Sequence, residues 1–227
     1  HFLFRGNAFF ILFLHSFHEG GSLLKLIAVT NDTLDNTSLA KRLIAIEPFI
    51  DYVIVREKSK RIVDWFALFD LLDRLSFPKE KIIIHDRLDV AHVRQFSTVQ
   101  LPGHSLPLQE AVKSYPQLAI GRSVHSYEEA IRAERDGASY LLYGHIYSTP
   151  SKKGVPPRGT DELRQIVRDV SIPVYAIGGI RLQHIDEMKT VGVDGIAVLS
   201  PFFTTDEPQH TALQFRTFIE RSEPDEH

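Results

Sequence analysis

Two cations close a short apolar run in the order Arg56-Glu57-Lys58. An arginine can hold a phosphate or carboxylate through two parallel hydrogen bonds, whereas a lysine acts as a point charge. Cations at the carboxyl end of a buried parallel strand face the ligand-binding side of a barrel. Arg56 and Lys58 are therefore candidate anion ligands. A solvated charge run is the alternative.

Gly178-Gly179 follows the apolar run 174–177, and Ser200 ends the apolar run 195–199. Glycine lets the backbone approach an anion closely, and backbone N–H groups then donate to its oxygens. In a (β/α)8 barrel the loops after the last two strands often hold phosphate. We therefore predict a phosphate site at Gly179 and Ser200. A tight turn alone would also explain the paired glycines.

The hydroxyl-rich segment 148–154 contains Lys152, a further candidate cation for a phosphate or a carboxylate. This composition is typical of a mobile lid over an active site, and equally of an ordinary loop.

His125 lies between the apolar run 118–121 and a predicted helix whose N-cap is Ser126. Histidine changes charge near neutral pH and can move protons during catalysis. His125 is therefore a candidate proton shuttle. Capping or packing at the helix start is the alternative.

The elements that must position these residues alternate along the chain. We predict strands at 26–30, 52–56, 82–84, 99–101, 118–121, 140–143, 174–177 and 195–199. Amphipathic stretches follow them at 39–47, 62–75, 88–95, 108–114, 127–136, 161–169, 183–191 and 210–220. Near-continuous apolar strands alternating with helices indicate a parallel sheet covered on both faces. Eight units predict an α/β (β/α)8 TIM barrel rather than an open doubly wound sheet.

Composition excludes several classes of protein. The chain has 227 residues, 43% of them apolar, a net charge of −3 and no cysteine. The charges are interspersed, so we expect no nucleic-acid partner. The absence of cysteine excludes disulfides and thiol catalysis and is compatible with the cytoplasm, where we expect the protein. The longest apolar run near the start, 8–14, is too short to span a membrane.

Residues 1–22 differ in pattern from the rest because they are rich in phenylalanine. We interpret them as a leader or another segment outside the domain, with a helix on the barrel exterior as the alternative. Residues 23–227 are predicted to form a single TIM-barrel domain. The eleven histidines include no His-x-His pair, and we expect no metal site and no cofactor.

Several motifs in order resemble the thiamine phosphate synthase/TenI superfamily over Leu24 to about Ile219. They are Leu-Ile-Ala-Val-Thr-Asn-Asp (26–32), Arg-Glu-Lys (56–58), Asp-Arg-Leu-Asp-Val-Ala (86–91), Gly-Arg-Ser-Val-His-Ser (121–126), Tyr-Gly-His-Ile-Tyr-Ser-Thr (143–149), Pro-Val-Tyr-Ala-Ile-Gly-Gly-Ile (173–180) and Gly-Val-Asp-Gly-Ile-Ala-Val-Leu-Ser (192–200). The resemblance implies a TIM barrel that acts on a small phosphorylated thiazole.

The chain departs from the synthase pattern at three places. Ile54 stands where synthases carry glutamine, His85-Asp86 replaces Asn-Asp, and the segment 101–105 lacks the acidic residue that helps to hold magnesium. The two-carboxylate Mg²⁺ site for a pyrophosphate leaving group is therefore incomplete.

The segments 100–102 and 121–126 are instead similar to the TenI branch. This similarity implies an isomerase, a thiazole tautomerase of thiamine biosynthesis that aromatises a carboxylated thiazole phosphate with His125 as proton shuttle and no metal. Two alternatives stay open: a Mg²⁺-dependent thiamine phosphate synthase, and a non-catalytic regulator that binds a phosphorylated metabolite. We expect neither a membrane nor a nucleic-acid partner, and a homodimer is compatible with the sequence.

Overall fold

The computed structural model describes residues 23–152 and 154–221, and in them eight parallel strands pair in chain order, with β1 and β8 closing the barrel. The strands are β1 (Lys25–Val29), β2 (Tyr52–Val55), β3 (Ile82–His85), β4 (Thr98–Leu101), β5 (Ala119–Val124), β6 (Tyr140–Gly144), β7 (Val174–Ile177) and β8 (Gly195–Val198). The predicted TIM-barrel fold is confirmed. The proposed leader, residues 1–22, lies outside the described residues.

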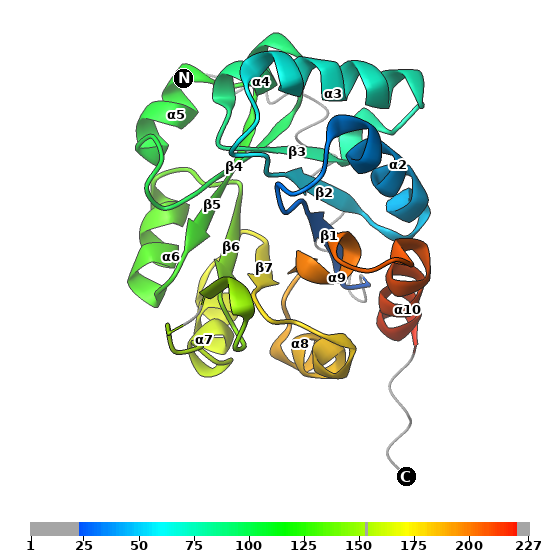
Figure 1. Cartoon of the computed structure of the whole chain (residues 1–227). Coiled ribbons are helices and arrows are strands. Elements are labelled where there is room, and N and C mark those ends of the chain that lie inside the picture. The colour runs from blue at the N-terminus through cyan, green and yellow to red at the C-terminus, as the bar shows by residue number, and fades with distance from the viewer. Residues whose placement is uncertain (1–22, 153, 222–227) are drawn as a thin grey trace.

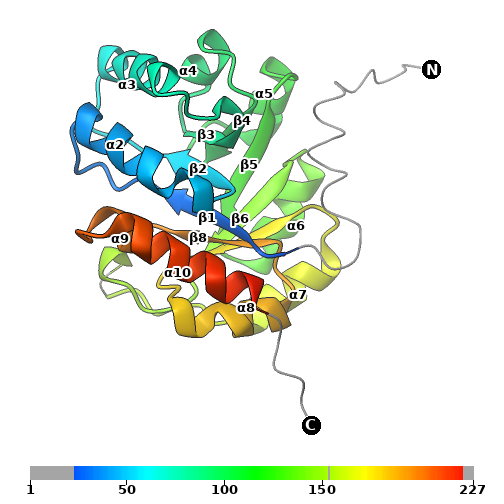
Figure 2. The ribbon, with the colours of Figure 1, turned by 90° about the vertical axis from the view of Figure 1, so that its right-hand side faces the viewer.

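Helices surround the strands (Figure 1, Figure 2). They are α2 (Asn36–Ile46), α3 (Ile62–Arg74), α4 (Leu88–Val93), α5 (Leu108–Ser114), α6 (Tyr127–Arg135), α7 (Asp161–Asp169), α8 (Ile185–Val191), α9 (Ser200–Phe203) and α10 (Pro208–Glu220). Short 3-10 turns lie at η1 (Glu47–Phe49), η2 (Lys79–Lys81), η3 (Pro150–Lys152) and η4 (Leu182–His184). Within the described part of the chain, no helix has the length and apolar character needed to cross a membrane.

Two apolar clusters hold the barrel together because side chains alternate between the faces of each strand. The larger cluster lies between strands and helices and includes Trp65, Phe69 and Phe202. The smaller cluster fills the barrel interior and consists of Ile27, Val29, Ile54, Ile83, Tyr140, Leu142, Tyr175 and Ala197. The interior is therefore a packed core, and ligands must bind at its mouth.

Gly121 makes room in this interior for an aromatic pair. Tyr140 lies edge-on to Tyr175, with 5.6 Å between ring centroids, and its hydroxyl donates to the Val99 carbonyl over 3.3 Å. A Cβ at position 121 would overlap the Tyr140 ring. Glycine is thus required at position 121 by packing against Tyr140 and not by a turn.

The structure corrects two boundaries that affect the site. β5 extends to Val124, so Arg122 and Ser123, which the sequence placed in a loop, belong to the strand. Ser123 accepts a hydrogen bond over 3.0 Å from Gln100 of the neighbouring strand. Ser200 does not end a strand but begins the short helix α9, which the sequence did not predict.

Candidate functional site

A cavity of about 270 Å³ opens beyond the carboxyl ends of β2, β3 and β4. The residues that line it are mostly charged: Glu57, Lys58, Lys60, Trp65, His85, Asp86, Arg87 and His104. Two lysines and an arginine face two carboxylates there, and Arg87 also pairs with Asp89 over 2.5 Å. The lining therefore carries a small excess of positive charge, which favours an anionic ligand.

His85, the last residue of β3, has a pKa that depends on its burial and on the charges around it. Burial, followed by the nearby positive charge of Arg56, lowers the pKa of His85 from 6.5 to about 4. Lys58 and His104 lower it further, while Asp86 opposes them. His85 is therefore neutral at pH 7, and the cations of the β2 loop lie close enough to act on the same ligand.

The depressed pKa of His85 predicts acid sensitivity. Below pH 6.5 the unfolded chain takes up a proton that the native protein does not accept until about pH 4, so stability falls with pH across this window. Between pH 7 and pH 4.5, urea unfolding of the wild type should lose about 2 kcal/mol more than that of His85→Asn. A proton NMR titration midpoint of His85 near 6.5 would contradict this assignment.

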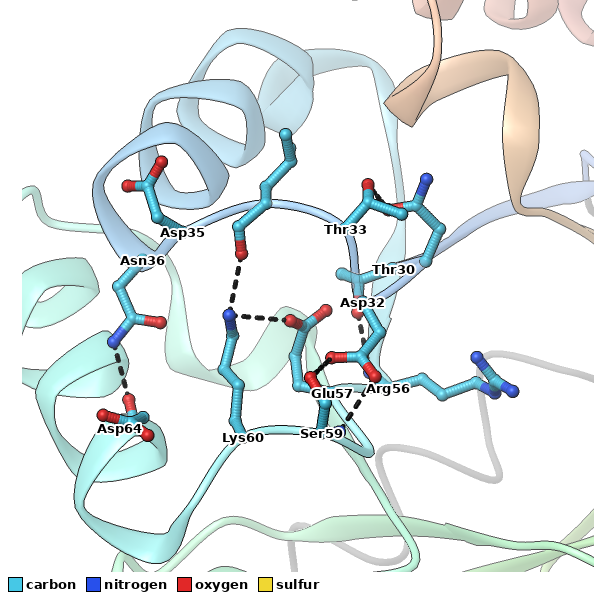
Figure 3. A network of polar contacts seen from close by, with 12 residues as sticks. Thr30, Asp32, Thr33, Asp35, Asn36, Arg56, Glu57, Ser59, Lys60 and Asp64 are labelled. Carbon is cyan, nitrogen blue, oxygen red and sulfur yellow. Dashed lines mark hydrogen bonds and ion pairs between the residues drawn. The ribbon is translucent and has the colours of Figure 1, made fainter.

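Hydrogen bonds hold the β2–α3 loop at Arg56 and at Lys60, on either side of Lys58 (Figure 3). The Arg56 backbone N–H donates to the Thr30 hydroxyl over 2.8 Å. Lys60 Nζ donates to the Leu34 carbonyl over 2.8 Å and lies 3.1 Å from Glu57 Oε2. The Arg56 side chain points away from this ion pair. Glu57 and Lys60 therefore largely neutralise each other, which leaves Arg56 and Lys58 for a ligand.

The family implies magnesium, and the residues present do not fit it. Asp86 accepts a hydrogen bond from the Ser105 hydroxyl, and Ser105 lies in the loop where a synthase would supply a second carboxylate. No group of three or more potential His, Asp or Glu ligands occurs among the described residues. Of the two carboxylates in the lining, Glu57 is paired with Lys60, and Asp86 by itself is too few for a Mg²⁺ site held by protein alone.

His125 is fixed at the end of β5 by two contacts. Its ring Nδ1 lies 2.6 Å from the Gly144 carbonyl oxygen, and its backbone N–H donates to Glu129 over 2.6 Å. Because a carbonyl only accepts, Nδ1 carries the proton in this contact and Nε2 is left as the acceptor in the neutral ring. Ser126 caps α6 by accepting from the Glu129 backbone N–H, as the sequence predicted.

Gly179 lies beneath the loop that follows β6. Both Gly178 and Gly179 have positive φ, and a Cβ at 179 would come within 2.7 Å of the Tyr147 and Ser148 carbonyl oxygens. Loop packing therefore already requires these glycines, and their presence is no independent sign of phosphate binding. Any larger residue at position 179 would displace the β6 loop, so such a variant cannot test phosphate binding by itself.

The predicted site residues fall on two sides of the mouth. Arg56 and Lys58 follow β2, whereas Gly179 and Ser200 follow the adjacent strands β7 and β8. Of the predicted residues, Lys58 alone is in the cavity lining, and Arg56 precedes it in the same loop. Lys152 is exposed in η3, between β6 and α7.

Sequence reasoning omitted several residues from its candidate site. They are His85, Asp86, Arg87, His104 and Lys60, all in the cavity lining. Position after a strand could have identified the first three, since ligand-binding residues of a barrel gather there. Lys60 belongs to the basic run 56–60 that follows the second strand, but its contact with the Leu34 carbonyl could not be predicted from the sequence.

Comparison with known proteins identifies the chain's relatives. The family described as thiamine monophosphate synthase (TMP-TENI) matches residues 26–202. The thiamine-phosphate synthase of Pyrococcus horikoshii is 43% identical over 169 residues, which cover 74% of this chain and 75% of the relative. That of Pyrococcus abyssi is 34% identical over 198 residues, which cover 87% and 95%. A solved structure, the thiamine phosphate pyrophosphorylase of Pyrococcus furiosus, superposes with a TM-score of 0.75 at 32% identity, covering 87% of this chain and 96% of that one.

These findings correct the predicted reaction class. The isomerase prediction was wrong, because these relatives are named thiamine-phosphate synthases, which are transferases. The expected family and the link to thiamine biosynthesis are confirmed. The chain belongs to the thiamine monophosphate synthase family.

Proposed function

We propose that this protein is a transferase that makes thiamine phosphate by coupling a phosphorylated thiazole to a pyrimidine carrying pyrophosphate. In this reaction a carbon–nitrogen bond forms between the two rings. The bond from the pyrimidine methylene carbon to the pyrophosphate oxygen breaks, and pyrophosphate leaves with the electron pair. The observation that carries the proposal is the charged cavity beyond β2, β3 and β4, with Lys58 in its lining, in a chain whose relatives are named synthases.

Two separate anion-binding regions suit a reaction with two anionic substrates. In the closed strand order, β3 lies across the barrel from β7, whereas β2 is separated from β8 by β1 alone. We assign pyrophosphate to Arg56 and Lys58, and the phosphate of the thiazole to the loops at Gly179 and Ser200. Lys152 could assist either anion. The two rings would then meet between these regions, above the interior core.

Cationic side chains are the charge stabilisers that this mouth offers to a leaving pyrophosphate. Preorganised positive groups stabilise charge that develops in a transition state more than charge already present in the substrate. Arg56 suits this role because its guanidinium can hold two oxygens at once. His125 Nε2 would accept a hydrogen bond from a substrate ring, since its Nδ1 is engaged with Gly144.

Calorimetry tests the two-region arrangement. Inorganic pyrophosphate and the phosphorylated thiazole should bind the wild-type chain at the same time, one of each per chain, because their anions are assigned to different loops of the mouth. Titration of the second ligand into protein saturated with the first measures this directly. Competition for one site would contradict the proposal. Binding of both without any turnover would favour the non-catalytic regulator.

The remaining expectations stay predictions. They are a cytoplasmic location, no nucleic-acid or membrane partner, and compatibility with a homodimer.

A further inference from the structure

The loop after β1 and the loop after β2 are joined by contacts that run in the same order along both (Figure 3). Thr30 accepts from the Arg56 backbone N–H, and Asp32 accepts from Ser59. The Leu34 carbonyl follows with its hydrogen bond from Lys60. The β2–α3 loop is thus held along its length by the neighbouring loop.

Asp32 makes the double contact in the middle of this series. Its Oδ2 accepts from the Ser59 backbone N–H and its Oδ1 from the Ser59 hydroxyl, each over 2.8 Å. Asp32 has φ of 63°, in the left-handed region that aspartate tolerates better than most residues. A side chain held in this way restrains the backbone on the C-terminal side of Lys58, while the Thr30 contact restrains it at Arg56.

We propose that Asp32 is a positioning residue that orders the loop carrying Arg56 and Lys58 for binding of a diphosphate group. The inference rests on the proposed function in one respect, namely that pyrophosphate is the ligand of this loop. Asp32 itself does not touch the ligand in this account. Asp32 keeps the β2–α3 loop ordered before the ligand binds. Ligands bind more tightly to a preordered loop because less conformational freedom is lost on binding.

The hydrogen bonds of Asp32 and its negative charge predict opposite effects of its removal on anion binding. As a carboxylate near Arg56 and Lys58, Asp32 by its charge alone would weaken anion binding, so its removal should tighten binding. As an ordering contact, its removal should weaken binding. Asparagine separates the two effects, because it is neutral yet can accept from the Ser59 N–H and donate to the Ser59 hydroxyl.

The chain also supplies a matched control. Asp35 lies in the same loop and makes similar contacts, accepting from the Ser38 backbone N–H over 3.0 Å and from the Ser38 hydroxyl over 2.6 Å. These contacts cap α2 and do not reach the β2–α3 loop. Asp35→Ala should therefore lower the melting temperature without changing anion affinity.

The experiment is calorimetric titration of inorganic pyrophosphate into the full chain and into three variants. Asp32→Ala should weaken pyrophosphate binding about tenfold, the value expected for two lost hydrogen bonds of modest net strength. Asp32→Asn should stay within about threefold of the wild type because it keeps both contacts. Asp35→Ala should match the wild type. Hydrogen exchange of the Lys58 and Ser59 amides should accelerate in Asp32→Ala alone.

Steady-state kinetics adds a readout that a purely structural role would not produce. Asp32→Ala should raise KM for the diphosphate substrate while kcat is largely retained, because the loop can still order once the ligand is bound. Wild-type affinity in Asp32→Ala, or tighter binding in both Asp32 variants, would overturn the inference and leave the proposed function intact. Failure of the wild type to bind pyrophosphate would overturn the proposed function as well.

Discussion

Replacing Arg56 with glutamine is expected to reduce kcat/KM for the diphosphate substrate about 100-fold, the loss expected when a charged hydrogen-bonding partner of the ligand is removed. The guanidinium is the group that can hold two oxygens of the leaving pyrophosphate, and glutamine is polar but shorter and uncharged. Circular dichroism should show an unchanged barrel, because the Arg56 backbone N–H still donates to Thr30.

Arg61→Gln is the matched control for this variant. Arg61 lies in the same loop but is exposed and pairs with Asp64 over 3.0 Å at the start of α3. Its replacement should leave kcat/KM within about twofold, since screened surface pairs contribute little. Equal losses in the two variants would mean that net charge, rather than a specific contact at Arg56, governs the reaction.

Gly121→Ala is expected to destabilise the protein by about 3 kcal/mol or more, because adding a methyl group to a filled core forces its neighbours to move. The added Cβ would overlap the ring of Tyr140, which is fully buried beside Tyr175 and bonded to the Val99 carbonyl. Urea unfolding at pH 7 measures the effect.

Gly103→Ala provides the comparison, because the nearest atom to its added Cβ is 3.9 Å away. Its free energy of unfolding should change by less than about 1 kcal/mol, as for most surface substitutions. In addition, Gly121→Ala combined with Tyr140→Leu should cost less than the sum of the single changes, since the leucine removes the overlap. Strict additivity would show that the two side chains do not meet.

The fold was predictable because eight apolar runs and their helices repeat along the chain, and all eight strands occur where the runs are. The predicted ends of strands were less accurate where a strand contains polar side chains. Arg122 and Ser123 read as loop residues, yet Ser123 pairs with Gln100 across β4 and β5, and Arg122 donates to the Gly103 carbonyl over 2.8 Å. Polar residues in a strand are tolerated when their neighbours satisfy them.

The candidate site was predictable only in part. Position after a strand predicted Arg56, Lys58 and His125 as candidates, since the barrel directs these ends to one mouth. Of these three, Lys58 is in the cavity lining. The anchoring role of Asp32 and the hydrogen bond of Lys60 to the Leu34 carbonyl could not be found, because both depend on contacts between loops that are distant in sequence.

The reaction class was misassigned because single departures were given too much weight. Ile54 packs in the barrel interior. Ser105 donates a hydrogen bond to Asp86 from the loop in which a second carboxylate was expected. The chain is 34% identical to a named synthase over 87% of its length, and this similarity includes strands, helices and loops together. It is therefore stronger evidence for the reaction class than single departures from a motif.

One measurement tests the central claim most directly: the amounts of thiamine phosphate and pyrophosphate formed by the wild type from the phosphorylated thiazole and the pyrimidine diphosphate, with Mg²⁺ and with chelator. The account predicts that both products form in equal amounts under both conditions, and that both are lost together in Arg56→Gln but not in Arg61→Gln. Folded wild-type protein that binds both substrates and releases neither product under either condition would contradict it.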